Sequence, residues 1–239
     1  MALEQLTRQQ AAEEPAAGVP HLENGDRLSR AEFERRYEAM PALKKAELIE
    51  GVVHVPSPVR ITIHGRPHGL IMTWLGVYSA ATPGVDLADN TTVRLDLDNE
   101  PQPDALLRID DAAGGRSHVD ADGYVEGPPE LVVEVAASSA AIDRHTKLHV
   151  YRRNGVKEYL IWQVLDRRLE WFELRGSEYV ALESDARGLV RSRVFPGLRL
   201  AVPALLDGDL AAVLAAQQAE LGTDEHARFV ESVTAQLDR

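Results

Sequence analysis

Apolar residues recur along this chain in short runs, and their spacing alternates between the period of a helix and that of a strand. The first clear run begins at Ser29, which lies three residues before Glu32 in the spacing of a capping box. Phe33, Tyr37 and Met40 then follow at helical intervals. This pattern predicts a helix that begins directly after Ser29.

The rest of the chain yields a series of strands and helices by the same criteria. We expect a hairpin at 47–55 with its turn at Glu50-Gly51, helices at 69–78, 140–153, 210–221 and from 223 onward, and strands at 91–97, 104–109, 131–135, 159–164, 169–174, 179–182 and 189–195. Residues 110–129 contain glycine and proline pairs and are predicted to form a long loop. The order of elements favours an α+β (mixed α/β) fold around one central sheet.

The predicted domain organisation is a main domain at residues 27–205 between two terminal additions. Residues 1–26 are polar and interrupted by prolines, which is typical of a disordered tail. Residues 206–239 are expected to form a helical extension. The chain has no cysteine and no apolar run of spanning length, so we expect a cytoplasmic protein with no membrane segment.

Glu134 is the strongest single candidate for chemistry. It interrupts the apolar run 131–135, and a carboxylate within a strand is costly unless it is solvated, paired or bound to a metal. The structural alternative is alternation, in which Glu134 faces solvent while Leu131, Val133 and Val135 face the core. Asp104 precedes another predicted strand, and taken by itself it is better interpreted as an ordinary turn residue.

Lys147 follows Glu134 on the next predicted helix. Asp143, Lys147 and Tyr151 are spaced i, i+4 and i+8, so they form one stripe in which Asp143 can orient the lysine. The alternative is a plain surface ion pair. If Asp104, Glu134 and Lys147 meet in space, two hard oxygen donors and an ammonium form a site for Mg²⁺ and a phosphodiester.

Two histidine pairs also have the i, i+4 spacing of metal ligands on a helix. They are His64 with His68, and His145 with His149. Gly65 and Pro67 make a regular helix between the first pair unexpected, and the second pair has no acidic partner in helical register. We therefore expect no histidine metal site.

The formal net charge of −12 argues against non-specific binding to nucleic acid, which normally requires a basic surface. The charge is uneven, however, because a basic stretch follows Glu134. It is either a local basic patch or a solvated helix face, and it comprises Arg144, Lys147, Arg152, Arg153 and Lys157.

Several segments together resemble one family. They are residues 47–51 (Glu-Leu-Ile-Glu-Gly), Pro103-Asp104, residues 129–135, Ser138-Ser139, the stripe described above and residues 155–162. In this combination and order the chain resembles the Uma-type restriction endonuclease family, within the PD-(D/E)XK nuclease superfamily, over about residues 28–205.

The resemblance implies a restriction-endonuclease-like core in which Asp104 and Glu134 bind Mg²⁺ or Mn²⁺. It implies that Glu47 is a third ligand or an aid to the attacking water, and that Asp143 and Tyr151 are supporting residues. One position departs from the superfamily pattern. The lysine expected two residues after the strand acid is replaced by Ala136, and Lys147 is the candidate to supply the same amine from the next helix.

The sequence therefore predicts a metal-dependent endonuclease acting on nucleic acid, with DNA the expected substrate. A homodimer is one assembly compatible with this activity, because restriction-type enzymes often cut two strands. The alternative is a catalytically inactive module that keeps the nuclease fold and binds nucleic acid or protein. The acidic net charge and Ala136 favour the alternative, whereas the carboxylate pair and Lys147 favour the enzyme.

Overall fold

The computed structural model describes residues 18–56, 60–137 and 142–238. Most of the expected tail at residues 1–26, and the Ser138-Ser139 segment, therefore lie outside the described residues. Contact clustering divides the chain into two compact units. The first unit is Met1–Pro58 with Arg94–Gln102, and the second is Val59–Val93 with Pro103–Arg239.

The first unit contains a helix and a hairpin that the sequence predicted. Helix α2 (Arg30–Glu38) begins after Ser29, whose hydroxyl accepts a hydrogen bond from the backbone N–H of Glu32 at 3.4 Å. Strands β1 (Glu47–Ile49) and β2 (Val52–His54) pair antiparallel. Their turn residues Glu50 and Gly51 have φ of 52° and 71°. Two left-handed residues are what a tight hairpin turn requires.

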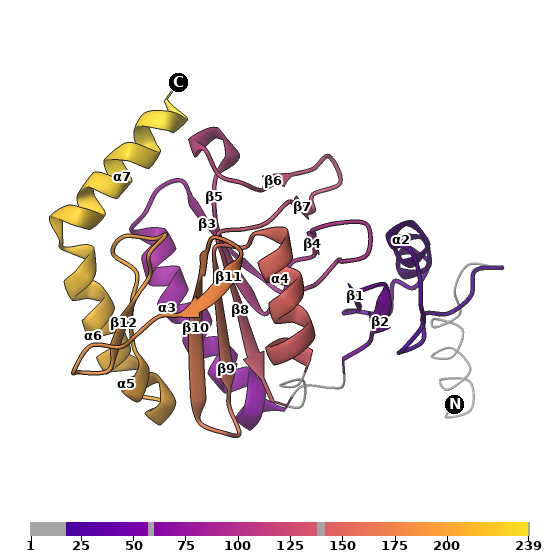
Figure 1. The fold of residues 1–239 in the computed structure, drawn as a ribbon, viewed down its shortest axis with the longest axis horizontal. Coiled ribbons are helices and arrows are strands. Elements are labelled where there is room, and N and C mark those ends of the chain that lie inside the picture. Colours follow the sequence, from indigo (N-terminus) through magenta and orange to yellow (C-terminus); the bar gives the residue numbers. More distant parts are fainter. Residues whose placement is uncertain (1–17, 57–59, 138–141, 239) are drawn as a thin grey trace, which may run out of the picture. The chain divides into compact units, whose positions relative to one another are not determined.

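A six-stranded mixed sheet forms the centre of the second unit, in the order β11-β10-β9-β8-β5-β3 (Figure 1). Its strands are β3 (Val85–Asp89), β5 (Ala105–Ile109), β8 (Leu131–Ala136), β9 (Glu158–Gln163), β10 (Arg168–Arg175) and β11 (Glu178–Ala181). Strands β8 and β9 are parallel, whereas the other neighbouring pairs are antiparallel. The predicted hairpin of residues 159–174 is confirmed as β9 and β10.

Helical segments cover both faces of this sheet. The connection between the parallel strands is a π-helical turn, η3 (Ile142–Lys147), that continues as α4 (Leu148–Asn154). It lies over the face of Glu134, where the Tyr151 ring packs 5.1 Å from that of Tyr159. The other face is covered by α3 (Arg66–Ala80), and a second π-helical turn, η1 (Ile61–Gly65), leads directly into that helix.

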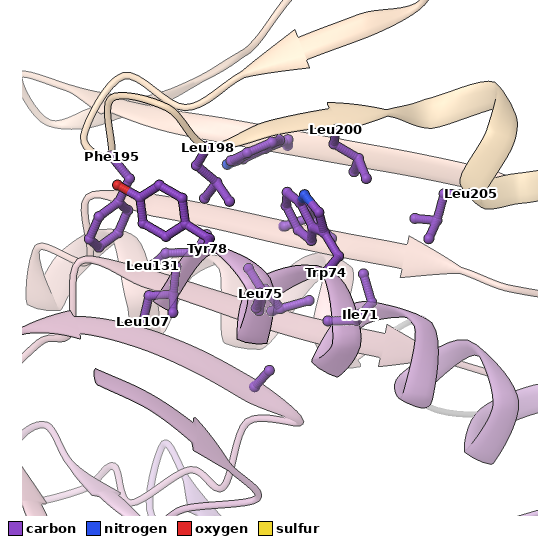
Figure 2. Close-up of a cluster of buried hydrophobic side chains, with 14 of the residues drawn as sticks. Ile71, Trp74, Leu75, Tyr78, Leu107, Leu131, Phe195, Leu198, Leu200 and Leu205 are labelled. Carbon is purple, nitrogen blue, oxygen red and sulfur yellow. The ribbon is translucent and has the colours of Figure 1, made fainter. Parts of the chain in front are cut away.

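The main core lies between α3 and the sheet. Ile71, Trp74, Leu75 and Tyr78 of α3 are fully buried and pack with apolar residues of the strands and of the segment after β12 (Figure 2). The Trp74 indole donates to the carbonyl of Arg199 at 2.8 Å and to the Gln217 side chain at 3.0 Å. These bonds attach the C-terminal elements to the core.

The C-terminal part of the second unit consists of β12 (Leu189–Arg191), β13 (Arg199–Ala201), α5 (Val202–Asp207), α6 (Leu210–Leu221) and α7 (Asp224–Leu237). The bounds of α6 match the prediction, and Thr223 caps α7 by accepting from the N–H of His226 at 3.3 Å. No helix of the described residues is long and apolar enough to cross a membrane.

Several predicted boundaries were wrong. The expected strand at 91–97 is reduced to β4 (Val93–Arg94), and Leu97 is 75% exposed. The expected loop at 110–129 contains η2 (Asp111–Ala113), β6 (His118–Val119) and β7 (Val125–Glu126), and neither β3 nor β13 was predicted. Alternating apolar residues predict a face, but a strand forms only where a neighbour supplies backbone partners.

Candidate active site

Glu134 lies near the end of β8, where every residue of the strand is buried. Its carboxylate is not solvated, so the expectation that alternation could leave it wet was wrong. Instead, Oε1 accepts hydrogen bonds from the Lys147 ammonium and from the Tyr151 hydroxyl, both at 2.9 Å. An ion pair and a hydrogen bond offset the cost of burying the carboxylate.

The predicted stripe of Asp143, Lys147 and Tyr151 faces Glu134. Lys147 Nζ lies 3.5 Å from Asp143 Oδ1 and 2.9 Å from Glu134 Oε1, with its side chain 5% exposed. The ammonium therefore bridges two buried carboxylates. The surface ion pair considered as an alternative is excluded by this burial. Tyr159 completes the arrangement, because its hydroxyl donates to the carbonyl of Asp143 at 2.8 Å.

The buried negative charges of this region affect the pKa of Tyr159. Complete burial raises its pKa well above the ordinary value, and the negative charges of Glu134 and Asp143 raise the pKa further. The Tyr159 hydroxyl is therefore a neutral donor at physiological pH, and it holds the backbone of Asp143 in place without adding charge.

Asp104 directly precedes β5, the strand next to β8. The register pairs Ala105 with Val133, and one further step places Asp104 opposite Glu134. Asp104 is buried, and its Oδ2 accepts the backbone N–H of Val135 at 2.8 Å. The two predicted carboxylates thus come from neighbouring strands at the same end of the sheet.

Two histidines that the sequence did not indicate as metal ligands also reach Asp104. His64 Nε2 lies 3.2 Å from Asp104 Oδ1, and His68 Nε2 lies 2.9 Å from the Asp104 carbonyl oxygen. A regular helix was not expected across Gly65 and Pro67, and the structure is π-helical through Gly65 and α-helical only from Arg66. Pro67 occupies the first turn of α3, where a missing N–H costs nothing.

Glu47 was the third predicted acidic residue. It lies on β1 in the first unit, where its Oε1 accepts the backbone N–H of Gln102 at 2.8 Å. That bond fixes the carboxylate within its own unit. Its role at a metal site stays a prediction.

The carboxylate pair suits one kind of metal site. Within residues 18–56, 60–137 and 142–238, no group of three or more His, Cys, Asp or Glu side chains has the spacing to hold a metal ion. A preformed cage is therefore absent from that part of the chain. Two buried carboxylates on adjacent strands do fit Mg²⁺, which is commonly bound by one or two carboxylates with water and substrate phosphate.

The fold agrees with comparisons to known proteins. A family model described as Uma2, "Putative restriction endonuclease", matches residues 30–203. The chain belongs to the Uma2 family. A solved structure from Anabaena variabilis ATCC 29413, titled as a putative nuclease belonging to DUF820, superposes with a TM-score of 0.56 at 13% identity. The match covers 73% of this chain and 97% of that one, and it shows a shared fold. No curated protein matches.

The structure shows where the nearest lysine lies, given that position 136 is alanine and not the lysine of the superfamily pattern. Ala136 ends β8 and carries no amine, and Lys147 enters the same region from η3. The ammonium reaches Glu134 instead of solvent. Lys147 therefore does not point to solvent, and its catalytic role stays a prediction.

Proposed function

We propose that this protein is a divalent-cation-dependent endonuclease that hydrolyses phosphodiester bonds of nucleic acid, with DNA as its substrate. The observation that carries the proposal is the buried Lys147–Glu134 ion pair beside Asp104. Burying charged groups is costly unless they are paired, and buried clusters of titratable side chains are often found at functional sites. The family assignment supports the same conclusion.

Each residue of the site has a distinct role in this proposal. Asp104 and Glu134 hold Mg²⁺ or Mn²⁺, and the bound cation supplies Lewis-acid stabilisation of charge on the phosphate. Lys147 orients the attacking water or offsets charge at the scissile phosphate. Tyr151 and Asp143 position the Glu134 carboxylate and the Lys147 ammonium through the contacts described above.

The test combines cation titration with a cleavage assay. We expect calorimetry to show Mg²⁺ or Mn²⁺ binding to the wild type that is lost in Asp104→Asn/Glu134→Gln. Cation-stimulated cleavage of single- or double-stranded DNA should fall by at least about a thousandfold in the same variant, a loss of roughly 4 kcal/mol in transition-state stabilisation. Circular dichroism and thermal unfolding establish that the variant is folded.

A matched control distinguishes loss of the candidate site from a general effect of removing two negative charges. Asp207 and Glu178 belong to surface ion pairs, and their side chains are 69% and 71% exposed. Asp207→Asn/Glu178→Gln should bind the cation and cut as the wild type does. Cation binding without cleavage of any DNA or RNA would contradict the enzyme and support the inactive module. Binding that survives in the Asp104/Glu134 variant would mean that other residues hold the metal.

A further inference from the structure

Two arginines near the candidate site share a single carboxylate. Arg144 Nε lies 3.5 Å from Glu170 Oε2, and Arg168 donates to Glu170 Oε1 at 2.6 Å. The buried amide of Gln163 also donates to Glu170 Oε2, at 2.9 Å. Two guanidinium charges and one carboxylate charge leave one net positive charge at this place. The arrangement therefore differs from a simple surface ion pair, in which the two charges cancel.

The shared carboxylate lies in the same row of the sheet as Glu134. The register pairs Glu134 of β8 with Ile161 of β9, and Ile161 with Glu170 of β10. Side chains of paired residues leave the same face of a sheet, and neighbouring strands are about 4.8 Å apart. The backbone positions of the two glutamates are therefore about 10 Å apart on one face. The ends of β8 and β9 and the turn into β10 lie together at one end of the sheet (Figure 1).

Both arginines remain open to solvent, whereas the groups that hold them do not. The side chains of Arg144 and Arg168 are 40% and 51% exposed, but that of Glu170 is only 17% exposed. A guanidinium carries several N–H donors in a fixed plane, and one contact with a carboxylate uses only part of them. Donors therefore remain on both side chains for a ligand at the surface.

A backbone phosphate of DNA is the ligand that suits these donors. Planar guanidinium groups match the oxygens of a phosphate, and a phosphate brings the charge that balances the excess positive charge. One strand of B-DNA rises about 3.4 Å per nucleotide, so about 10 Å corresponds to about three nucleotides. A strand whose scissile phosphate lies at Glu134 can thus place another of its phosphates at the two arginines.

We propose that Arg144 and Arg168 together bind a backbone phosphate of the substrate DNA, about three nucleotides from the scissile bond. Glu170 holds both guanidinium groups, and Gln163 holds Glu170. This inference rests on the proposed function, because it takes DNA as the substrate. It adds the residues that hold the strand in register, a role that phosphate contacts serve without reading the sequence. The net charge of −12 still opposes binding, so these contacts act together with the bound cation.

A matched pair of double variants tests the contact. They are Arg144→Gln/Arg168→Gln and the control Arg152→Gln/Arg175→Gln. Arg152 and Arg175 also form ion pairs with glutamates, at 2.7 and 2.8 Å, but they lie at the far ends of α4 and β10. Arg168 and Arg175 are about 23 Å apart along one strand. The control thus removes the same two charges and the same kind of contact away from the site.

Fluorescence anisotropy with a labelled DNA duplex, in Ca²⁺ and over about 50 to 200 mM salt, measures the loss. The slope of log affinity against log salt should fall by about 1 in Arg144→Gln/Arg168→Gln, because one phosphate contact is removed. Affinity at low salt should fall about fivefold. Both quantities should stay at their wild-type values in the control. Thermal unfolding establishes that both variants are folded.

Cleavage kinetics add a second readout. Arg144→Gln/Arg168→Gln should raise KM about fivefold and leave kcat within about twofold of the wild type, because the lost contact binds substrate and transition state equally. The control should change neither constant.

Three results would overturn the phosphate contact. They are an unchanged salt slope in Arg144→Gln/Arg168→Gln, an equal change in the control, and a fall in kcat without a change in KM. The contact and the nuclease proposal can fail separately. A reduced slope in a protein that cuts no DNA would uphold the contact and contradict the nuclease, whereas cleavage with an unchanged slope would do the reverse.

Discussion

Two buried glutamates on neighbouring strands are stabilised by different means. Glu134 on β8 meets an ammonium and a hydroxyl, as described above. Glu158 on β9 instead accepts hydrogen bonds from Trp171 Nε1, the Ser192 hydroxyl, and the backbone N–H groups of Arg193 and Val194. Neutral donors around Glu158 hold the segment after β12 in place, whereas Glu134 faces the charged ammonium of Lys147. The surroundings therefore distinguish a structural glutamate from a catalytic candidate.

Glu158 predicts a pH dependence of stability. Burial raises its pKa from 4.5 to about 7, although the four hydrogen bonds act to lower it. A raised folded pKa stabilises the folded state fully below pH 4.5, and this contribution is lost as the pH rises through about 7. The total is at most about 3 kcal/mol.

The measurement compares urea unfolding of the wild type and Glu158→Gln across this range. The variant cannot titrate, and its amide places N–H groups among donors, so we expect it to be less stable at low pH. Its deficit should shrink between pH 4.5 and 8, because only the wild type loses stability. Glu178→Gln, an exposed control, should show a constant difference. A constant deficit in Glu158→Gln would mean that Glu158 titrates normally.

At the scale of elements, the carboxylate and the amine of the candidate site come from two different elements. Strand β8 carries Glu134, and the turn η3 carries Lys147. Glu134 and Ala136 lie two residues apart on β8, so their side chains leave the same face of the strand. Lys147 approaches Glu134 from η3. The Lys147 ammonium therefore reaches Glu134 from a backbone position outside β8.

A double substitution tests whether the amine or its backbone position matters. We expect Lys147→Ala to reduce cleavage by about 10³-fold, comparable with the loss of a group that stabilises transition-state charge. Ala136→Lys/Lys147→Ala should recover at least tenfold of that loss, about 1.4 kcal/mol. Thermal unfolding must accompany the assay, because Ala136 is buried and lysine needs space there. If the double variant folds but recovers no cleavage activity, the amine must act from position 147 on η3.

At the scale of the whole molecule, the acidic charge and the candidate function oppose each other. The formal net charge is −12. The basic stretch after Glu134 does not offset it as a single patch, because Lys147 is buried and Arg144 and Arg152 pair with Glu170 and Glu178 at 3.5 and 2.7 Å. Binding of nucleic acid must then depend on neutralising the site itself.

The excess of negative charge predicts that the protein binds nucleic acid more tightly when a cation is bound. Fluorescence anisotropy with a labelled duplex should show at least about tenfold tighter binding in Ca²⁺ than in EDTA, because a bound cation reverses the local repulsion of phosphate. Asp104→Asn/Glu134→Gln should bind equally in both conditions, since it lacks the repelling carboxylates. Equal affinity of the wild type in Ca²⁺ and EDTA would locate the binding surface elsewhere.

The sequence alone determined the local elements. The Ser29 cap, the Glu50-Gly51 turn, the β9–β10 hairpin and the bounds of α6 all follow from propensity, spacing and turn chemistry, which act over a few residues. The Asp143–Lys147–Tyr151 stripe was predicted for the same reason, because helical spacing fixes which side chains share a face.

Only the tertiary structure decided what those elements meet. Whether Glu134 is wet or buried depends on a helix that covers its strand, and the pairing of Asp104 with β8 depends on strand register. His64 and His68 were dismissed because a local rule about Gly65 and Pro67 outweighed a contact that spans 40 residues of sequence. Strands β3 and β13 need partners that no local pattern specifies. Backbone pairing and burial are long-range properties, so they were settled by folding and not by any short segment of the chain.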